Sequence, residues 1–136
     1  MWLLVPVTVL TLARSLIHIL RSDGGAQSIA TIPLDSFSEP AAAAVILIFA
    51  LWGLSQLLLG LLYVVVLIRY RALVPLMYLT LIVEYFGRLA LGLWKPMQTL
   101  DRPPGATFTL VMIVLSLVMF ALSLRQHPSA TRARSA

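Results

Sequence analysis

The chain has 136 residues, of which 60% are hydrophobic and 11% are charged, and its formal net charge is +5. Because a soluble domain carries about 25% charged residues, this composition excludes an ordinary soluble protein and predicts one compact membrane domain. The basic residues flank apolar runs instead of forming one face, which argues against nucleic-acid binding, and the lack of cysteine excludes disulfides, thiol redox chemistry and cysteine metal sites.

The first predicted span covers residues 2–20, an apolar run that Arg14 and His18 interrupt. A secretory signal has a basic start and an uninterrupted apolar centre. This run has neither, so we expect a transmembrane helix that stays in the protein.

Residues 21–40 form the first predicted loop. The glycine pair Gly24 and Gly25 ends the helical pattern. Serine, acidic residues and proline at 35–40 then predict a short capped turn at the membrane interface, leading into the next helix.

Residues 41–68 make the longest apolar run. It exceeds the ~20 residues needed to cross a bilayer, so this second span is expected to tilt or to project beyond the hydrocarbon. A basic turn at 69–71 joins it directly to the third span, residues 72–94. Because this turn is so short, we predict that the two spans form the central antiparallel hairpin of the fold.

A proline-rich loop at 95–105 leads to the fourth predicted span, residues 106–124, and a basic polar tail, residues 125–136, follows. Low apolar content predicts that this tail is disordered. The chain is therefore predicted to be a single all-α domain, a bundle of four transmembrane helices over residues 1–124.

Orientation is predicted from lysine and arginine, which concentrate on the cytoplasmic side of membrane proteins. The second turn and the tail together carry five such residues: Arg69, Arg71, Arg125, Arg132 and Arg134. The two other loops carry three: Arg21, Lys95 and Arg102. We therefore expect both termini and the tail in the cytoplasm, and a multi-pass protein of the bacterial inner (plasma) membrane.

Four ionisable residues lie inside the predicted spans: Arg14, His18, Glu84 and Arg88. Each costs on the order of 3 kcal/mol in a bilayer unless it is paired or hydrated. The members of each pair are four residues apart and share a helix face. With both termini inside, the two pairs fall at similar depth, as does Gln56 in the second span. These five side chains are predicted to form one buried polar cluster.

Three functions are compatible with such a cluster. Two arginines against one glutamate leave a positive excess that suits a carboxylate, a phosphate or a lipid headgroup, so non-catalytic binding of a membrane lipid or another anionic amphiphile is the leading interpretation. The second is a structural or accessory subunit whose buried charges fix packing or a contact with a protein partner. The third is a proton- or ion-coupled carrier using Glu84 and His18, which would need a homo-oligomer because four spans enclose little pathway.

Small residues in the spans, Gly53, Gly60 and Gly87, are expected to let helices approach closely. For Trp52 the sequence suggests only a packing role. No nucleophile elbow, phosphate loop or HExxH motif occurs, so we expect no metal or cofactor. Whether the protein is an enzyme stays open, with the sequence leaning against it.

One part of the chain resembles a known group of proteins. The runs that carry the resemblance are YRALVPLMYL from Tyr70, EYFGRLALGLWKP from Glu84, RPPGA from Arg102, and the final ALSL. Gly87-Arg88 followed by Lys95-Pro96 is the most specific feature. These runs resemble small bacterial four-helix integral membrane proteins of unknown function. The resemblance implies an inner-membrane bundle of paired antiparallel spans and implies no activity.

Overall fold

The computed structural model describes residues 3–125, which form four α-helices and two short 3-10 helices. The α-helices are α1 (Leu4–Leu20), α2 (Glu39–Ile68), α3 (Val74–Trp94) and α4 (Pro104–Arg125). The 3-10 helices are η1 (Leu34–Ser36) and η2 (Arg71–Leu73). The predicted all-α class and the four helices are confirmed. Apart from Arg125, which ends α4, the predicted tail lies outside the described residues.

Three helical segments are long and apolar enough to cross a membrane: α2, α3 together with η2, and α4. The 30 residues of α2 extend about 45 Å at ~1.5 Å per residue, more than the ~30 Å hydrocarbon core. Helix α1 is shorter, with 17 residues. The chain is thus a small helical membrane protein, with three candidate membrane-spanning helices within residues 3–125.

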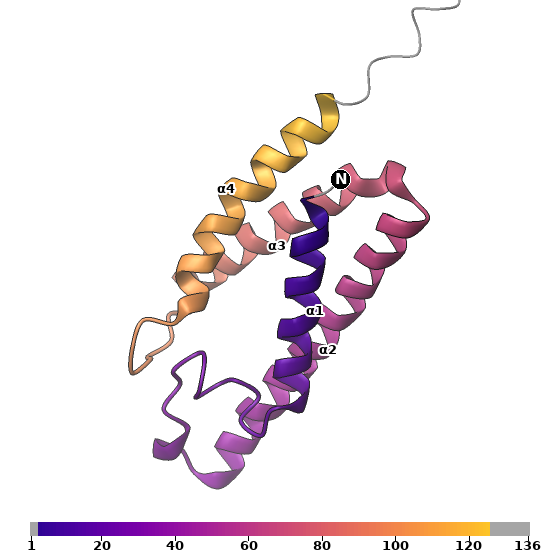
Figure 1. Cartoon of the computed structure of the whole chain (residues 1–136). Helices are drawn as coiled ribbons and strands as arrows, with labels where there is room; N and C mark the ends of the chain where they lie inside the picture. The colour runs from indigo at the N-terminus through magenta and orange to yellow at the C-terminus, as the bar shows by residue number, and fades with distance from the viewer. Residues whose placement is uncertain (1–2, 126–136) are drawn as a thin grey trace, which may run out of the picture.

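The helices pack as two pairs, α1 against α2 and α3 against α4 (Figure 1). The backbones of α2 and α3 approach each other closely at few positions, although only residues 69–73 separate the two helices. A short turn joins α2 and α3 as predicted, but the main packing lies within the α1–α2 and α3–α4 pairs and not between these two helices. We attribute this to side-chain size, because α2 turns glycines toward α1, whereas the cluster that includes α3 contains the large side chains of Tyr63 and Tyr78.

Glycines set the close approach of α1 and α2. A Cβ added to Gly53 would lie 2.8 Å from the Cβ of His18 and 3.0 Å from the backbone oxygen of Ser15. A Cβ added to Gly60 would lie 2.6 Å from a methyl carbon of Leu12. At Gly87 an added Cβ meets nothing within 4 Å, so among the described residues Gly87 does not serve the packing role predicted for it.

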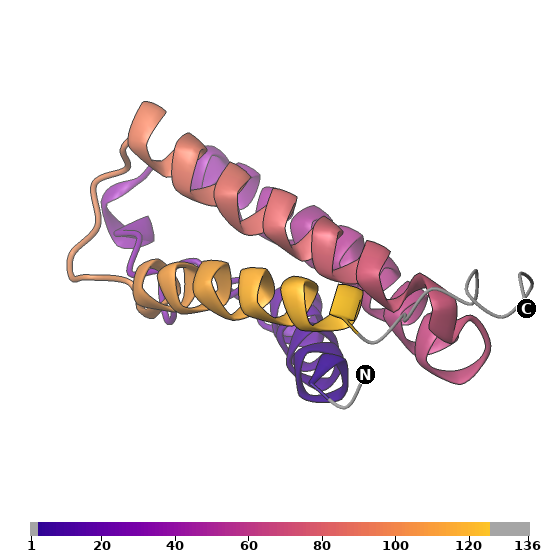
Figure 2. The ribbon, with the colours of Figure 1, turned by 90° about the horizontal axis from the view of Figure 1, so that it is seen from above.

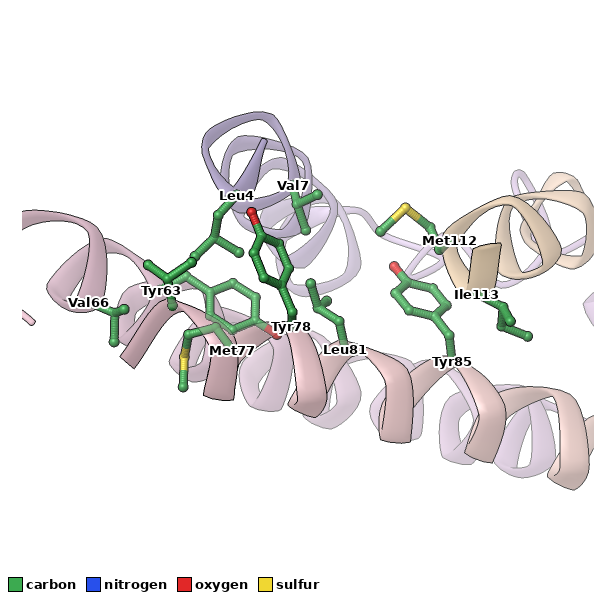
Figure 3. Packing of buried hydrophobic residues seen from close by; sticks show 11 residues of the cluster. Leu4, Val7, Tyr63, Val66, Met77, Tyr78, Leu81, Tyr85, Met112 and Ile113 are labelled. Atoms are coloured by element: carbon green, nitrogen blue, oxygen red, sulfur yellow. The ribbon is translucent and has the colours of Figure 1, made fainter. Parts of the chain in front are cut away.

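A single apolar cluster connects all four helices (Figure 3). Tyr63 of α2 and Tyr78 of α3 are almost fully buried, and Tyr78 points toward Leu4 of α1. Farther along α3, Tyr85 packs with Met112 of α4. The aromatic side chains of α3 thus join the two helix pairs.

The two long loops meet at one end of the molecule, opposite the turn between α2 and α3 (Figures 1 and 2). The backbone N–H of Leu100 donates to the carbonyl of Thr31 at 2.9 Å, and the Thr31 hydroxyl donates to the carbonyl of Asp101 at 2.8 Å. A short 3-10 turn, η1, overlaps the turn predicted at 35–40 only in part, because residues 39–40 already belong to α2, and neither helix has a side-chain cap hydrogen bond within the described range. This arrangement puts residues 21–38 and 95–103 on the same side of the bundle.

Candidate intramembrane polar site

Four of the five predicted polar residues form one hydrogen-bonded chain across three helices. The Nη2 of Arg14 on α1 donates to Gln56 Oε1 on α2 at 3.1 Å, and Gln56 Nε2 donates to Glu84 Oε1 on α3 at 3.0 Å. Arg88 closes the chain: its Nε donates to the same Glu84 oxygen at 3.0 Å, and its Nη2 forms an ion pair with it. Glu84 is therefore the common acceptor of the cluster.

Helical spacing explains how the chain brings these groups together. Glu84 and Arg88 are four residues apart on α3 and so share one face. Gln56 belongs to the buried face of α2, between Gly53 and Gly60, and is only 6% exposed. The close approach that the glycines permit brings α1 near enough for the long side chain of Arg14 to reach Gln56.

His18 is buried beside the cluster but lies outside its hydrogen-bonded chain. Its Nδ1 lies 2.7 Å from the carbonyl oxygen of Gly24, and a carbonyl only accepts, so this ring nitrogen carries the proton. The bond fastens the end of α1 to the loop that follows. Among residues 3–125 no hydrogen bond joins His18 to Glu84, so the relay that the carrier hypothesis needs is not continuous there.

Trp52, for which the sequence suggested only packing, lies against the cluster. Its ring centroid lies 4.5 Å from that of His18, and the guanidinium carbons of Arg14 and Arg88 lie 5.5 Å and 4.7 Å from it. These are cation–π distances. Trp52 precedes Gln56 by four residues and so lies on the same face of α2, which is the signal that could have identified it.

The cluster carries more positive than negative charge. Two guanidinium groups share the one carboxylate of Glu84, which leaves a formal charge of +1. In addition, the Nε of Arg14 is buried and has no hydrogen-bond partner among the described residues. The side chains of Glu84 and Arg88 are 17% and 22% exposed, so the protein covers most of both.

Two clefts border the cluster. One, of about 270 Å³, lies between α3 and α4 and is lined by Arg88 and by Arg102 of the second loop. The other, of about 290 Å³, is lined by Arg14 together with Ile29 and Phe108. Each arginine of the cluster therefore lines one of these two clefts.

Within residues 3–125, no three histidine, aspartate or glutamate side chains gather as a metal site would require. Comparisons of the chain with protein families, with curated proteins and with solved structures find no match. The function is therefore argued from the polar cluster itself.

Proposed function

We propose that this protein binds a lipid or another anionic amphiphile without catalysis, and that Arg14, Gln56, Glu84 and Arg88 form the polar end of its site. The observation that carries the proposal is the charge of the cluster: two arginines share one glutamate, and each arginine also borders a cleft. An uncompensated charge in a poorly hydrated site is costly. An anionic headgroup would compensate it.

Arginine suits this role because its planar fork of donors matches carboxylate and phosphate oxygens. Arg88 uses two of its five N–H donors on Glu84 among the described residues, so three remain for a ligand. The ring of Trp52 contacts both guanidinium groups by cation–π interactions. These contacts do not use the N–H donors of the arginines. The site would thus be ordered before the ligand arrives.

We also infer a four-span topology in the bacterial inner membrane with both termini in the cytoplasm. Helix α1 extends about 26 Å at ~1.5 Å per residue, close to the ~30 Å hydrocarbon core, and it packs along α2. Arg69, Arg71 and Arg125 lie at the end of the bundle that this topology assigns to the cytoplasm.

Native mass spectrometry of the protein purified in mild detergent tests the binding proposal. The wild-type protein should carry an adduct of defined mass, and Arg88→Ala should lose it. Arg71→Ala, which removes an exposed arginine at the opposite end of α3, is the control and should keep the adduct. A wild-type protein without any adduct would refute the proposal.

A structural or accessory subunit is the second candidate, favoured by the hydrogen bonds that tie α1, α2 and α3 together through the cluster. In that case Arg88→Ala should lower the free energy of unfolding by about 3–5 kcal/mol, because Glu84 is left unpaired. Adding Glu84→Gln should then restore part of the stability. A protein partner should also co-purify in stoichiometric amount, and no lipid adduct should depend on Arg88.

A further inference from the structure

The cleft between α3 and α4 combines two cationic side chains with an apolar wall. Arg88 enters it from α3 and Arg102 from the loop before α4. The remaining wall is mainly aliphatic and includes Leu89, Leu93 and Leu110. No acidic side chain lines this cleft, and Arg102 forms no ion pair with any residue in the described range.

Both arginines lie in the half of the bundle that carries the two long loops. Arg88 lies six residues before Trp94, the last residue of α3, or about 9 Å below the helix end. Its guanidinium turns back to Glu84, one helical turn deeper, and the side chain still lines the cleft. Arg102 lies in the loop at the same end and lines the same cleft, which therefore has a cation at two points of its wall.

We propose that this cleft, the α3–α4 cleft, holds a membrane lipid with an anionic phosphate headgroup and prefers it over a zwitterionic lipid. The phosphate would lie between Arg88 and Arg102, and one acyl chain would follow the leucines of the wall. This inference rests on the proposed binding function and deepens it by naming the site and the lipid class. An ethanolamine or choline group would bring a cation beside two guanidinium groups with no carboxylate of the cleft to receive it.

The size of the cleft fits partial enclosure of a lipid. About 270 Å³ is slightly below the ~300–1,000 Å³ of small-molecule pockets. It would therefore take the headgroup and the start of one chain, while the rest of the lipid remains in the bilayer.

Two glycines of α3 provide a matched steric test. Gly92 lines the cleft and Gly87 does not, and at both positions an added Cβ meets nothing within 4 Å. Gly92→Leu should fill the cleft and lower lipid retention about tenfold or more, without a loss of folding. Gly87→Leu should bind like the wild type.

A second test changes the charge of the cleft and complements the steric test. The purified protein is incubated with equal amounts of phosphatidylglycerol and phosphatidylethanolamine, and bound lipid is measured by native mass spectrometry. The wild type should retain phosphatidylglycerol preferentially, and Arg102→Gln should reduce that preference about tenfold, the effect of one lost charged contact. Lys95→Gln removes a charge at the same end of the bundle but outside the cleft, and it should leave the preference unchanged.

The outcomes separate this inference from the function on which it rests. If no lipid is retained through Arg88, both are refuted. If Arg88→Ala releases a lipid but Gly92→Leu and Arg102→Gln do not, amphiphile binding stands and the α3–α4 cleft is the wrong site. Equal retention of the two lipids in the wild type would overturn the headgroup preference.

Discussion

A single carboxylate oxygen, Oε1 of Glu84, accepts from Gln56 and from two nitrogens of Arg88. Every hydrogen bond of the cluster except that between Arg14 and Gln56 ends on this atom. Because no other acidic side chain takes part in the cluster among the described residues, Glu84 also supplies its only negative charge. We therefore expect Glu84 to be the most sensitive position of the site.

Glu84→Gln keeps the size of this side chain and removes its charge, leaving two guanidinium groups without a counterion. The expected result is a loss of about 3–5 kcal/mol in the free energy of unfolding of the delipidated protein. Equilibrium unfolding in mixed micelles measures it, with Asp101→Asn in the exposed second loop as a control. An unchanged unfolding curve for Glu84→Gln would mean that the cluster contributes little to the fold.

Asp23 stabilises the start of the first loop by accepting backbone hydrogen bonds. Its carboxylate accepts the backbone N–H of Gly25 at 2.9 Å and that of Ser28 at 2.7 Å. Burial acts to raise the pKa of Asp23, but these hydrogen bonds and the charge of Arg21 outweigh it and lower the pKa to about 2. Since the pKa is lower in the folded state, Asp23 stabilises the loop above its usual pKa of 3.8, and this stabilisation is lost as the pH falls toward 2.

Carboxyl titration followed by NMR tests this prediction. The Asp23 resonance should titrate near pH 2 in the folded protein and near its usual pKa of 3.8 after denaturation. A folded-state midpoint near the usual value would show that the loop hydrogen bonds do not persist in solution.

Gly53 and Gly60 fix the contact of α1 with α2. The α1 atoms that face these two glycines differ in how easily they can move. At Gly53 an added Cβ meets the Cβ of His18 and the backbone oxygen of Ser15, which are both held by the helix. At Gly60 it meets the end of the Leu12 side chain, which can rotate.

Gly53→Ala should therefore cost about 1–3 kcal/mol of stability, in the range of overpacked cores. Gly60→Ala should cost less, because the rotation of Leu12 and the higher helix propensity of alanine offset the crowding. Gly92→Ala, which meets open space, is the control and should be neutral or stabilising. Thermal unfolding in detergent gives the order of the three variants, and equal effects at Gly53 and Gly60 would contradict this packing.

The sequence predicts the helices well because each is a long apolar run with clear breaks. Four of the five cluster residues are also predictable, since i,i+4 spacing and similar depth are visible without a structure. Which helices pack against each other is less predictable. The short turn between α2 and α3 makes them neighbours in the chain but does not determine which helix each one contacts most. The hydrogen bond of His18 was not predictable, because its partner is a loop carbonyl at Gly24, where the backbone takes a positive φ of 60°.

At the scale of the molecule, the two loops at one end hold the helix pairs in a common orientation. Hydrogen bonds of Thr31 with Leu100 and Asp101 join the loop after α1 to the loop after α3. Both loops must therefore lie on one side of any membrane that the helices cross, with the α2–α3 turn on the other.

Cysteine labelling tests this topology cleanly, because the natural chain has no cysteine. Ser36→Cys and Gln98→Cys place exposed thiols in the two loops, and Tyr70→Cys places one in the turn. In intact cells an impermeant maleimide should label the first two, whereas Tyr70→Cys should react only after the membrane is permeabilised. Labelling of only one loop in intact cells would contradict the fold. Labelling of the turn alone would keep the fold and reverse its orientation, placing the α3–α4 cleft in the cytoplasmic leaflet.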